Sequence, residues 1–299
     1  MAIQSVCVLG GTGFVGRHIV RLLCEQKVAV HVPTRSAGKA RQVLASLPAE
    51  AVQADVHDVA QLARLFAGVD AVINLVGILH EQGGQTFQRV HVDLPHKVIE
   101  AARVAGVGRL LHMSALNAAP DGPSAYLRSK GEAEKLVQAS GLQATSFRPS
   151  VIFGAEDSFL NLFARMAKWA PVLPLACADA RFQPVWVEDV ARVYVHSLND
   201  ADSIGQRYNL CGPQVYRLRE LVAFAAACRG RHPLILPLPR PVAYLQAAAM
   251  EWLPVKLMTR DNFYSMQQDS VCHCAFPFGI TPARLEDIAP QYLLELVRK

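Results

Sequence analysis

Residues 5–16 read Ser-Val-Cys-Val-Leu-Gly-Gly-Thr-Gly-Phe-Val-Gly, an apolar run followed at once by a glycine-rich turn. Such a run is typical of a strand buried on both faces. Gly10, Gly13 and Gly16 fill a G-x-x-G-x-x-G pattern, in which glycines permit a tight turn, close approach of a diphosphate and close helix packing. The turn therefore predicts a dinucleotide site, with a purely structural turn as the alternative. The expected contacts are Gly10, Gly11, Thr12, Gly13, Phe14, Val15 and Gly16.

This strand and the helix that follows it begin an alternating series. Further strands are predicted at residues 28–32, 51–53, 71–76, 109–113 and 144–147. Helices are predicted between them, at residues 39–47, 59–66, 90–102 and 126–139. Each connection between parallel strands must cross over the sheet, usually as a helix. The predicted fold class is therefore α/β, a Rossmann-type doubly wound parallel sheet.

The second half of the chain follows a different pattern. From about Gly154 the alternation stops, and prolines separate shorter helical pieces. We expect residues 1–153 to form a dinucleotide-binding Rossmann domain, completed by about residues 183–212. Residues 154–182 and 213–299 are expected to form a smaller C-terminal lid region that meets the substrate or a partner.

Composition excludes several classes of protein. The 299 residues are 52% hydrophobic and 18% charged, with a formal net charge of +5. The apolar content excludes disordered, collagen-like and coiled-coil proteins. The lysines and arginines are scattered, so no nucleic-acid partner is expected. A chain this apolar is expected to cover part of its surface with a protein partner or a membrane.

The apolar segment Leu234–Leu253 is too interrupted by charges and prolines to be a membrane span. Its later half predicts an amphipathic helix. The apolar face of that helix would carry Val242, Leu245, Ala249 and Trp252. We expect this face to pack on the protein's own core, with lipid as the alternative. The lipid alternative would make the chain a peripheral membrane protein.

The chain runs directly into its first strand, with no room for a signal peptide, so we expect a cytoplasmic location or one peripheral to the inner face of the membrane. Among seven cysteines, Cys7, Cys24 and Cys228 lie in apolar patterns typical of buried reduced thiols. Cys272-His273-Cys274 has no second ligand pair at zinc-like spacing. No metal site is expected.

The end of the second strand indicates which dinucleotide binds. An acidic residue there usually binds the ribose hydroxyl of NAD(H), whereas a cation binds the 2′-phosphate of NADP(H). The chain has Arg35, Ser36 and Lys39 and no acid. We therefore expect NADP(H) to be preferred, with NAD(H) or a merely solvated helix start as alternatives. Asp55 and Val56, after the third strand, are expected at the adenine edge unless they only precede a helix cap.

Three residues are candidates for catalysis. Tyr126 and Lys130 are four residues apart, on one face of a predicted helix. A nearby ammonium favours the phenolate of a tyrosine, which is otherwise a weak acid at neutral pH. Ser114 follows the fifth strand, at the sheet edge where ligands bind, and its hydroxyl is suited to bind a substrate carbonyl. The alternative is a structural role for Tyr126 and Lys130.

This set of residues resembles the extended and atypical short-chain dehydrogenases/reductases, over nearly the whole chain. Further matches are Asp55 and residues 74–77, 148–154 and 182–190. The resemblance implies that Tyr126 and Lys130 also hold the cofactor. It adds to the expected cofactor contacts Leu75, Val76, Gly77, Arg148, Pro149 and Val151.

Within this family, residues 74–79, 148–161 and 182–190 most resemble the branch of the NAD(P)H-binding accessory subunit of respiratory complex I and its bacterial relatives, described as nucleoside-diphosphate-sugar epimerases. The resemblance implies an NADP(H)-dependent oxidoreductase, or an epimerase- or dehydratase-like enzyme, for an unidentified small molecule. The alternative it implies is a non-catalytic NADPH-binding accessory or assembly protein with a respiratory or quinone-synthesis partner.

One position departs from the family pattern. The fourth residue of the family's usual catalytic set is an asparagine on the helix before the fifth strand. Here Val92, Asp93 and Leu94 stand where family enzymes have Val-Asn. We expect Asp93 to replace the asparagine.

Overall fold

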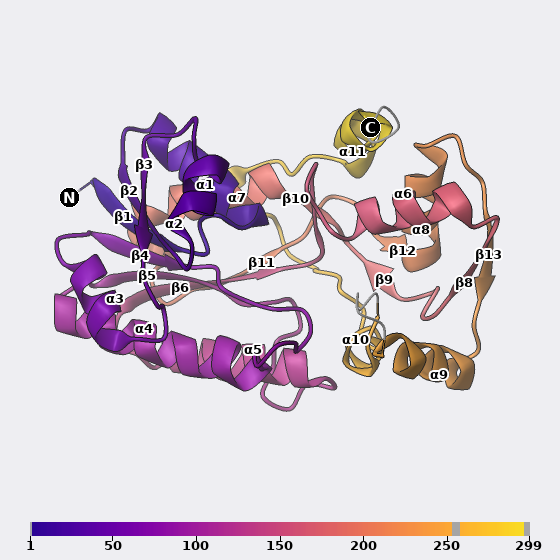
Figure 1. Ribbon diagram of the computed structural model, residues 1–299, viewed down its shortest axis with the longest axis horizontal. Coiled ribbons are helices and arrows are strands. Elements are labelled where there is room, and N and C mark those ends of the chain that lie inside the picture. The colour runs from indigo at the N-terminus through magenta and orange to yellow at the C-terminus, as the bar shows by residue number, and fades with distance from the viewer. Residues whose placement is uncertain (1, 253–257, 296–299) are drawn as a thin grey trace.

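Seven parallel strands form the central sheet of the computed structural model, which describes residues 2–252 and 258–295 (Figure 1). Their order is β11-β6-β5-β4-β1-β2-β3. The strands are β1 (Ser5–Leu9), β2 (Ala29–Thr34), β3 (Ala49–Gln53), β4 (Ala71–Asn74), β5 (Arg109–Met113), β6 (Gln143–Pro149) and β11 (Arg207–Leu210). The strand order reverses between β1 and β4, so their carboxyl ends border the crevice where such sheets bind ligands. The predicted Rossmann-type sheet is confirmed.

Helices cover both faces of this sheet (Figure 1). On one face lie α1 (Phe14–Glu25), α2 (Ala37–Val43) and α7 (Val187–Leu198). On the other lie α3 (Val59–Phe66), α4 (Leu94–Ala105) and α5 (Ala125–Gln138). Strand β1 is apolar throughout because it packs on both layers. Val6 and Val8 are buried in one core cluster, whereas Cys7 and Leu9 are buried in the other.

The helix predicted around residues 90–102 has two parts. It begins as a π-helical segment, Gln88–Asp93, which runs directly into α4. A π-helical turn holds an extra residue and therefore rotates the side chains relative to an α-helix. His91 on this segment is buried and lies against Ser129 of α5. Asp93 instead accepts a hydrogen bond from the Gln88 side chain at 2.9 Å.

The lid is built from short elements around a core of its own. They are β7 (Ile152–Phe153), α6 (Leu160–Trp169), β8 (Val172–Leu175), β9 (Arg181–Phe182), β10 (Val185–Trp186), β12 (Tyr216–Arg217), α8 (Leu218–Ala227), β13 (Leu234–Pro237), α9 (Arg240–Met250), α10 (Arg260–Ser265) and α11 (Leu285–Glu295). Leu160, Leu221 and Ala289 are fully buried where α6, α8 and α11 meet. In residues 185–198, β10 pairs with β7 in a separate two-stranded sheet, and α7 returns to the Rossmann domain and packs beside α1.

The sequence analysis predicted no disulfide, but the structure contains one. Cys211 and Cys272 form a disulfide whose Cα atoms lie 6.0 Å apart. They are 61 residues apart in sequence, and the fold places them together against Leu116. Cys7 is a buried free thiol as predicted, and Cys24 and Cys228 are free and partly buried. Within the described residues, no cluster of three His, Cys, Asp or Glu side chains is arranged to hold a metal ion.

The expected packing of the amphipathic helix α9 is also wrong. Its buried residues are Ala243 and Ala247. Val242 is 46% exposed and Leu245 is 65% exposed, so the face predicted to meet the core points outward. Small alanines bring α9 close to its neighbours and leave the larger side chains outside. Leu253, the last residue of the predicted segment, lies outside the described residues. No helix in residues 2–252 and 258–295 has the length and apolar content to cross a bilayer.

Candidate functional site

The glycine-rich turn after β1 is shaped by close backbone contacts. Gly10 has a φ of +80° and lies against Leu75, at the end of β4. A Cβ atom on Gly16 would lie 2.2 Å from the Gly10 carbonyl oxygen. Helix α1 therefore approaches the turn as closely as a dinucleotide-binding crossover requires. The predicted residues 10–16 and 75–77 are brought together at the switch point of the sheet.

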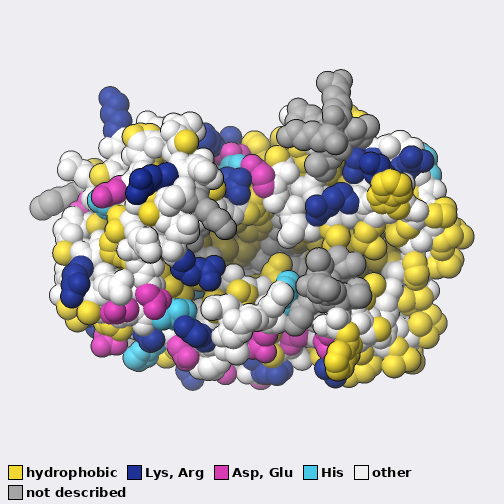
Figure 2. Space-filling view, viewed as in Figure 1, with side chains coloured by type: hydrophobic (Ala, Val, Ile, Leu, Met, Phe, Trp, Pro, Cys, Tyr) yellow, Lys and Arg dark blue, Asp and Glu magenta, His cyan; other side chains and the backbone are white. Residues whose placement is uncertain are grey.

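The start of α1 suits a diphosphate. Gly13 is its N-cap, no side chain of the described residues caps the helix, and its first turn has no acidic residue. Free N–H groups and the positive end of the helix dipole favour an anion here. Figure 2 shows the surface hollowed between the sheet and the lid. The chemistry of the turn therefore fits the dinucleotide that the sequence predicts.

The end of β2 carries cations and no carboxylate. Arg35 and Ser36 are exposed. Thr34 pairs in register with Gln53 of β3, so the neighbouring strand places no acid opposite the end of β2. Lys39 lies in α2, just beyond.

The segment after β3 is held by hydrogen bonds between its own residues. The Asp55 carboxylate accepts a hydrogen bond from the His57 N–H at 2.9 Å, and Val56 packs on the core. Asp58 caps α3 by accepting from the N–H groups of Ala60 and Gln61. Asp58 is therefore the helix cap, Asp55 supports the turn before it, and their place at the adenine edge stays a prediction.

Ser114 holds a buried hydroxyl without a partner. It follows β5, and its N–H donates to the Phe147 carbonyl of β6 at 2.8 Å. The residue is 2% exposed, yet no hydrogen bond to its Oγ is found within the described residues. An unsatisfied buried hydroxyl costs about 1–3 kcal/mol. The position is therefore suited to a ligand oxygen.

Lys130 lies beside Ser114. Its Nζ donates to the carbonyl of Met113, the residue before Ser114, at 2.9 Å. A Cβ atom on Gly77 would lie 3.2 Å from the same Nζ, so β4, β5 and α5 meet at this ammonium. Burial lowers the pKa of Lys130 to about 8.

Tyr126 lies one helical turn before Lys130. Burial, aided by the Asp261 carboxylate, raises the pKa of Tyr126 to about 12. Desolvation and a carboxylate from the lid therefore raise this pKa in the structure, and the stabilisation of the phenolate by Lys130 stays a prediction. At neutral pH the phenol is protonated.

The lid contacts α5, the helix of Tyr126 and Lys130, through Asp261 on α10. The Asp261 carboxylate accepts hydrogen bonds from the N–H groups of Ala125 at 2.7 Å and Tyr126 at 3.1 Å. Ser265, also on α10, donates to Ser124 at 2.8 Å. A lid residue thus caps the N-terminus of α5, and it places a negative charge beside Tyr126.

A model of the NAD dependent epimerase/dehydratase family matches residues 6–211, from β1 to the residue after β11. The chain belongs to the NAD-dependent epimerase/dehydratase family. The match spans the glycine turn, Ser114, Tyr126 and Lys130, and a bound NAD(P) cofactor is common to this family.

Relatives of this epimerase/dehydratase chain have diverse descriptions. The "NADH dehydrogenase [ubiquinone] 1 alpha subcomplex subunit 9, mitochondrial" of Mus musculus is 34% identical over 78% of this chain and 63% of its own length. The "Ceramide reductase" of Caulobacter vibrioides is 31% identical over 79% of this chain and 74% of its own. The chain therefore spans less than two thirds of the mouse subunit.

The fold is shared with solved structures. An NADPH-dependent quinone oxidoreductase from Escherichia coli, complexed with NADPH, superimposes with a TM-score of 0.70. The match covers 87% of this chain and 86% of the other at 23% identity.

The sequence analysis missed His91, which contacts both Ser129 and Tyr126 of α5. Its Nε2 accepts from the Ile78 N–H at 3.0 Å, and its Nδ1 lies 2.9 Å from Ser129 Oγ. The ring also packs edge-on against Tyr126, with centroids 5.5 Å apart. The prediction of Asp93 is wrong, because the π-helical segment turns His91 rather than Asp93 toward α5. Val90-His91-Val92, with histidine in the Val-Asn frame, was the available signal.

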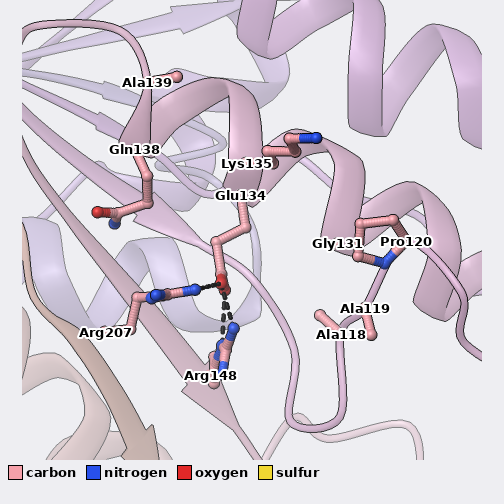
Figure 3. A pocket seen from close by; sticks show the side chains of 10 residues that line it. All are labelled: Ala118, Ala119, Pro120, Gly131, Glu134, Lys135, Gln138, Ala139, Arg148 and Arg207. Carbon is pink, nitrogen blue, oxygen red and sulfur yellow. Dashed lines mark hydrogen bonds and ion pairs between the residues drawn. The ribbon is translucent and has the colours of Figure 1, made fainter.

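Arg148 was predicted to contact the cofactor, but the structure does not bring it to the glycine turn. Its Nε donates to the buried Glu134 carboxylate at 2.7 Å, and Arg207 lies 3.5 Å from the same group. Figure 3 shows this cluster in the wall of a pocket of about 600 Å³ along α5. Glu134 lies four residues beyond Lys130, about one turn further along α5.

The other residues predicted beside Arg148 remain near the end of the sheet. The Pro149 carbonyl accepts from the Leu116 N–H, two residues beyond Ser114, at 3.0 Å. The Val151 carbonyl accepts from the Val185 N–H at 3.0 Å. Backbone rather than the arginine side chain therefore borders the site here.

Proposed function

We propose that this chain is an NADP(H)-dependent oxidoreductase, or an epimerase- or dehydratase-like enzyme, that acts on a small molecule through Ser114, Tyr126 and Lys130. The observation that carries the proposal is the Ser114 hydroxyl, buried and without a partner in the described part of the chain. It lies next to the Met113 carbonyl that Lys130 binds. A buried donor left open beside a buried ammonium is suited to a substrate oxygen.

The cofactor would be held by the residues of the β1–α1 turn and by those after β4. Gly10 to Gly16 would hold the diphosphate through backbone N–H groups, and Gly77 leaves room beside Lys130 for a ribose or nicotinamide group. NADP(H), when bound, supplies the hydride that such chemistry needs.

The three side chains have separate roles in this proposal. Ser114 Oγ donates to the substrate oxygen and orients it. Tyr126, protonated at neutral pH because its pKa is about 12, donates the proton from its Oη to that oxygen. Lys130, whose pKa is about 8, keeps most of its positive charge at pH 7 and stabilises the phenolate that remains. The protonated phenol favours the direction of carbonyl reduction.

The test of this proposal is Tyr126→Phe. Turnover of NADPH would be measured with a quinone, an aldehyde and a UDP-hexose, and NADPH binding would be measured by quenching of protein fluorescence. We expect turnover to fall by at least 100-fold with NADPH affinity unchanged. Turnover equal to wild type would overturn the proposed role of Tyr126.

The preference for NADP(H) rests on Arg35 and Ser36, which are exposed at the end of β2 with no acid beside them. An arginine pairs with a phosphate and not with a ribose hydroxyl. NADPH is expected to bind at least tenfold more tightly than NADH, and Arg35→Asp to reverse the order. Equal affinities of the wild-type chain for both dinucleotides would remove this preference.

The second candidate is a non-catalytic, NADPH-stabilised accessory protein with a respiratory or quinone-synthesis partner. The raised pKa of Tyr126 and its cover by Asp261 favour this role, because the helix is held by the lid rather than by a substrate. Likeness to the mouse complex I subunit also supports it. NADPH retained through purification, with no turnover of the three probes and recovery with a respiratory complex, would favour this role over catalysis.

A further inference from the structure

Half of the large hydrophobic side chains found exposed lie in one part of the lid. Seven of the fourteen fall in two stretches, residues 169–172 and 234–252. We name them the apolar lid face: Trp169, Val172, Leu234, Leu236, Val242, Leu245 and Trp252. Figure 2 shows hydrophobic side chains gathered along the right-hand end of the molecule, where Figure 1 places β8, β13 and α9. A patch of this kind on a soluble domain marks a binding surface.

The two-stranded ribbon β8–β13 is apolar on both sides. Its inward side chain Leu173 is buried, as the core requires. Outward, Leu234 stands opposite Val172 and is 60% exposed, and Leu236 stands opposite Pro174 and is 44% exposed. Strands with one solvated face normally alternate apolar with polar residues. The outward face of this ribbon carries apolar side chains at the positions where polar residues are normal.

Helix α9 continues the same surface. Gln246 of α9 donates to the Pro174 carbonyl of β8 at 3.0 Å, which joins the helix to the ribbon. Val242 and Leu245 are three residues apart and point outward, opposite Ala243 and Ala247. The exposed side chains of the ribbon and of the helix therefore belong to one face.

Both tryptophans of this face are nearly fully exposed. Trp252 is 91% exposed and Trp169 is 81% exposed. The Lys168 ammonium lies 5.0 Å from the centre of the Trp169 ring. An exposed indole beside a cation is the pairing found where proteins meet the headgroup region of a bilayer.

The charge of these segments has a single sign. Residues 158–178 and 221–250, which hold six of the seven side chains, contain no aspartate or glutamate. They contain five lysines and arginines: Arg165, Lys168, Arg229, Arg231 and Arg240. Glu251, just beyond α9, is paired with Arg260. These two segments therefore join exposed apolar side chains to basic charge, without an acidic residue.

We propose that the apolar lid face docks on the surface of an anionic lipid bilayer. Leucines, valines and indoles enter the interfacial layer, and the surrounding cations meet anionic headgroups. Basic charge argues for this occupant over a second copy of the chain, since two identical basic faces would repel each other. The inference is independent of the reaction, because the apolar lid face contains none of Ser114, Tyr126 and Lys130.

The experiment is flotation of the full-length chain with vesicles. Vesicles of phosphatidylcholine with 30% phosphatidylglycerol are compared with vesicles of phosphatidylcholine alone. We expect binding to the anionic vesicles at least tenfold tighter, and weaker at 0.5 M NaCl because salt screens the cations. Tryptophan emission is expected to shift to shorter wavelength on binding, since two of the three tryptophans lie on this face.

Variants separate the contribution of the apolar side chains to vesicle binding from that of the cations. Leu234→Ser combined with Leu245→Ser is expected to weaken binding to the anionic vesicles more than tenfold. Lys168→Gln and Arg231→Gln are each expected to weaken it about fivefold. Val104→Ser is the matched control, because Val104 is 71% exposed on α4 and lies outside the apolar lid face. Circular dichroism checks that each variant is folded.

Two results would overturn the proposal. One is wild-type protein that stays unbound with both kinds of vesicle, or a double leucine variant that binds as wild type does. The other is a dimer in sedimentation velocity that dissociates in the double leucine variant, because a second copy would then cover the face. Binding to a purified protein partner, with no affinity for anionic vesicles, counts against lipid in the same way.

Discussion

His91 Nδ1 and Ser129 Oγ lie 2.9 Å apart, and the hydrogen bonds around them determine the tautomer of the imidazole. The Ile78 N–H has to donate, so Nε2 is the acceptor and Nδ1 carries the proton. Nδ1–H then donates to Ser129, whose hydroxyl donates to the Tyr126 carbonyl at 2.8 Å. His91 therefore connects the segment after β4 to α5.

Removing this connection is expected to loosen the site. His91→Leu keeps the volume but leaves the Ile78 N–H unpaired, so the free energy of unfolding should fall by about 1–3 kcal/mol. NADPH affinity should fall with it, because Gly77 lies against both His91 and Lys130. Urea unfolding and fluorescence titration measure the two effects. The control is His96→Leu on exposed α4 surface; equal losses in both variants would contradict the assignment.

Two buried histidines make stability depend on pH. Burial, together with Lys130, lowers the pKa of His91 to about 2 and that of His112 to about 3. In the unfolded chain both titrate near 6.5, so the unfolded state binds more protons between pH 6.5 and about 3. Their contribution to stability is full above pH 6.5 and is lost as the pH falls.

The size of this effect at pH 5 is about 2 kcal/mol for each histidine. Urea unfolding at pH 7 and pH 5 would measure it, and His91→Asn should reduce the difference between the two values. A variant whose pH dependence matches that of wild type would show that His91 does not titrate in this way.

The packing of α1 on the glycine turn predicts the effect of a single methyl group. In Gly16→Ala the new Cβ would meet the Gly10 carbonyl, so α1 must move and the diphosphate site is disrupted. We expect NADPH binding to be lost and the melting temperature to fall. Gly38→Ala is the matched control in helix α2, with no atom within 4 Å, and should be neutral or stabilising by about 0.5–1 kcal/mol. NADPH binding by Gly16→Ala at wild-type affinity would contradict the prediction.

Asp261→Asn tests the influence of the lid on Tyr126. Loss of the carboxylate should lower the pKa of Tyr126, because Asp261 is one cause of its increase. If Tyr126 donates a proton, activity declines as the pH rises through its pKa. The alkaline limb of the pH profile of kcat/KM should therefore move to lower pH in the variant. Glu251→Gln, also on the lid but paired with Arg260, should leave the limb unchanged. If the alkaline limb of Asp261→Asn is identical to that of wild type, Asp261 has no influence on the proton transfer.

Local sequence patterns predicted the sheet well. β1 was predicted at its observed bounds, because glycines end an apolar run that both helix layers bury. The approach of α1 to Gly10 follows from the spacing of the same glycines. The directions in which the side chains of residues 88–93 point were predicted less well. A π-helical turn changes which side chain meets α5, and it leaves no periodic signal in the sequence. His91 was therefore overlooked in favour of Asp93.

The sequence by itself determined the strand–helix alternation, the phosphate-binding turn and the Ser114, Tyr126 and Lys130 candidates, because each depends on residues close together in the chain. Only the tertiary structure decided the Cys211–Cys272 disulfide, the cap that Asp261 places on α5 and the outward face of α9. Each of these depends on segments that meet across the fold. Burial and charge at such meetings, and not residue type, raised the pKa of Tyr126 above that of a free tyrosine.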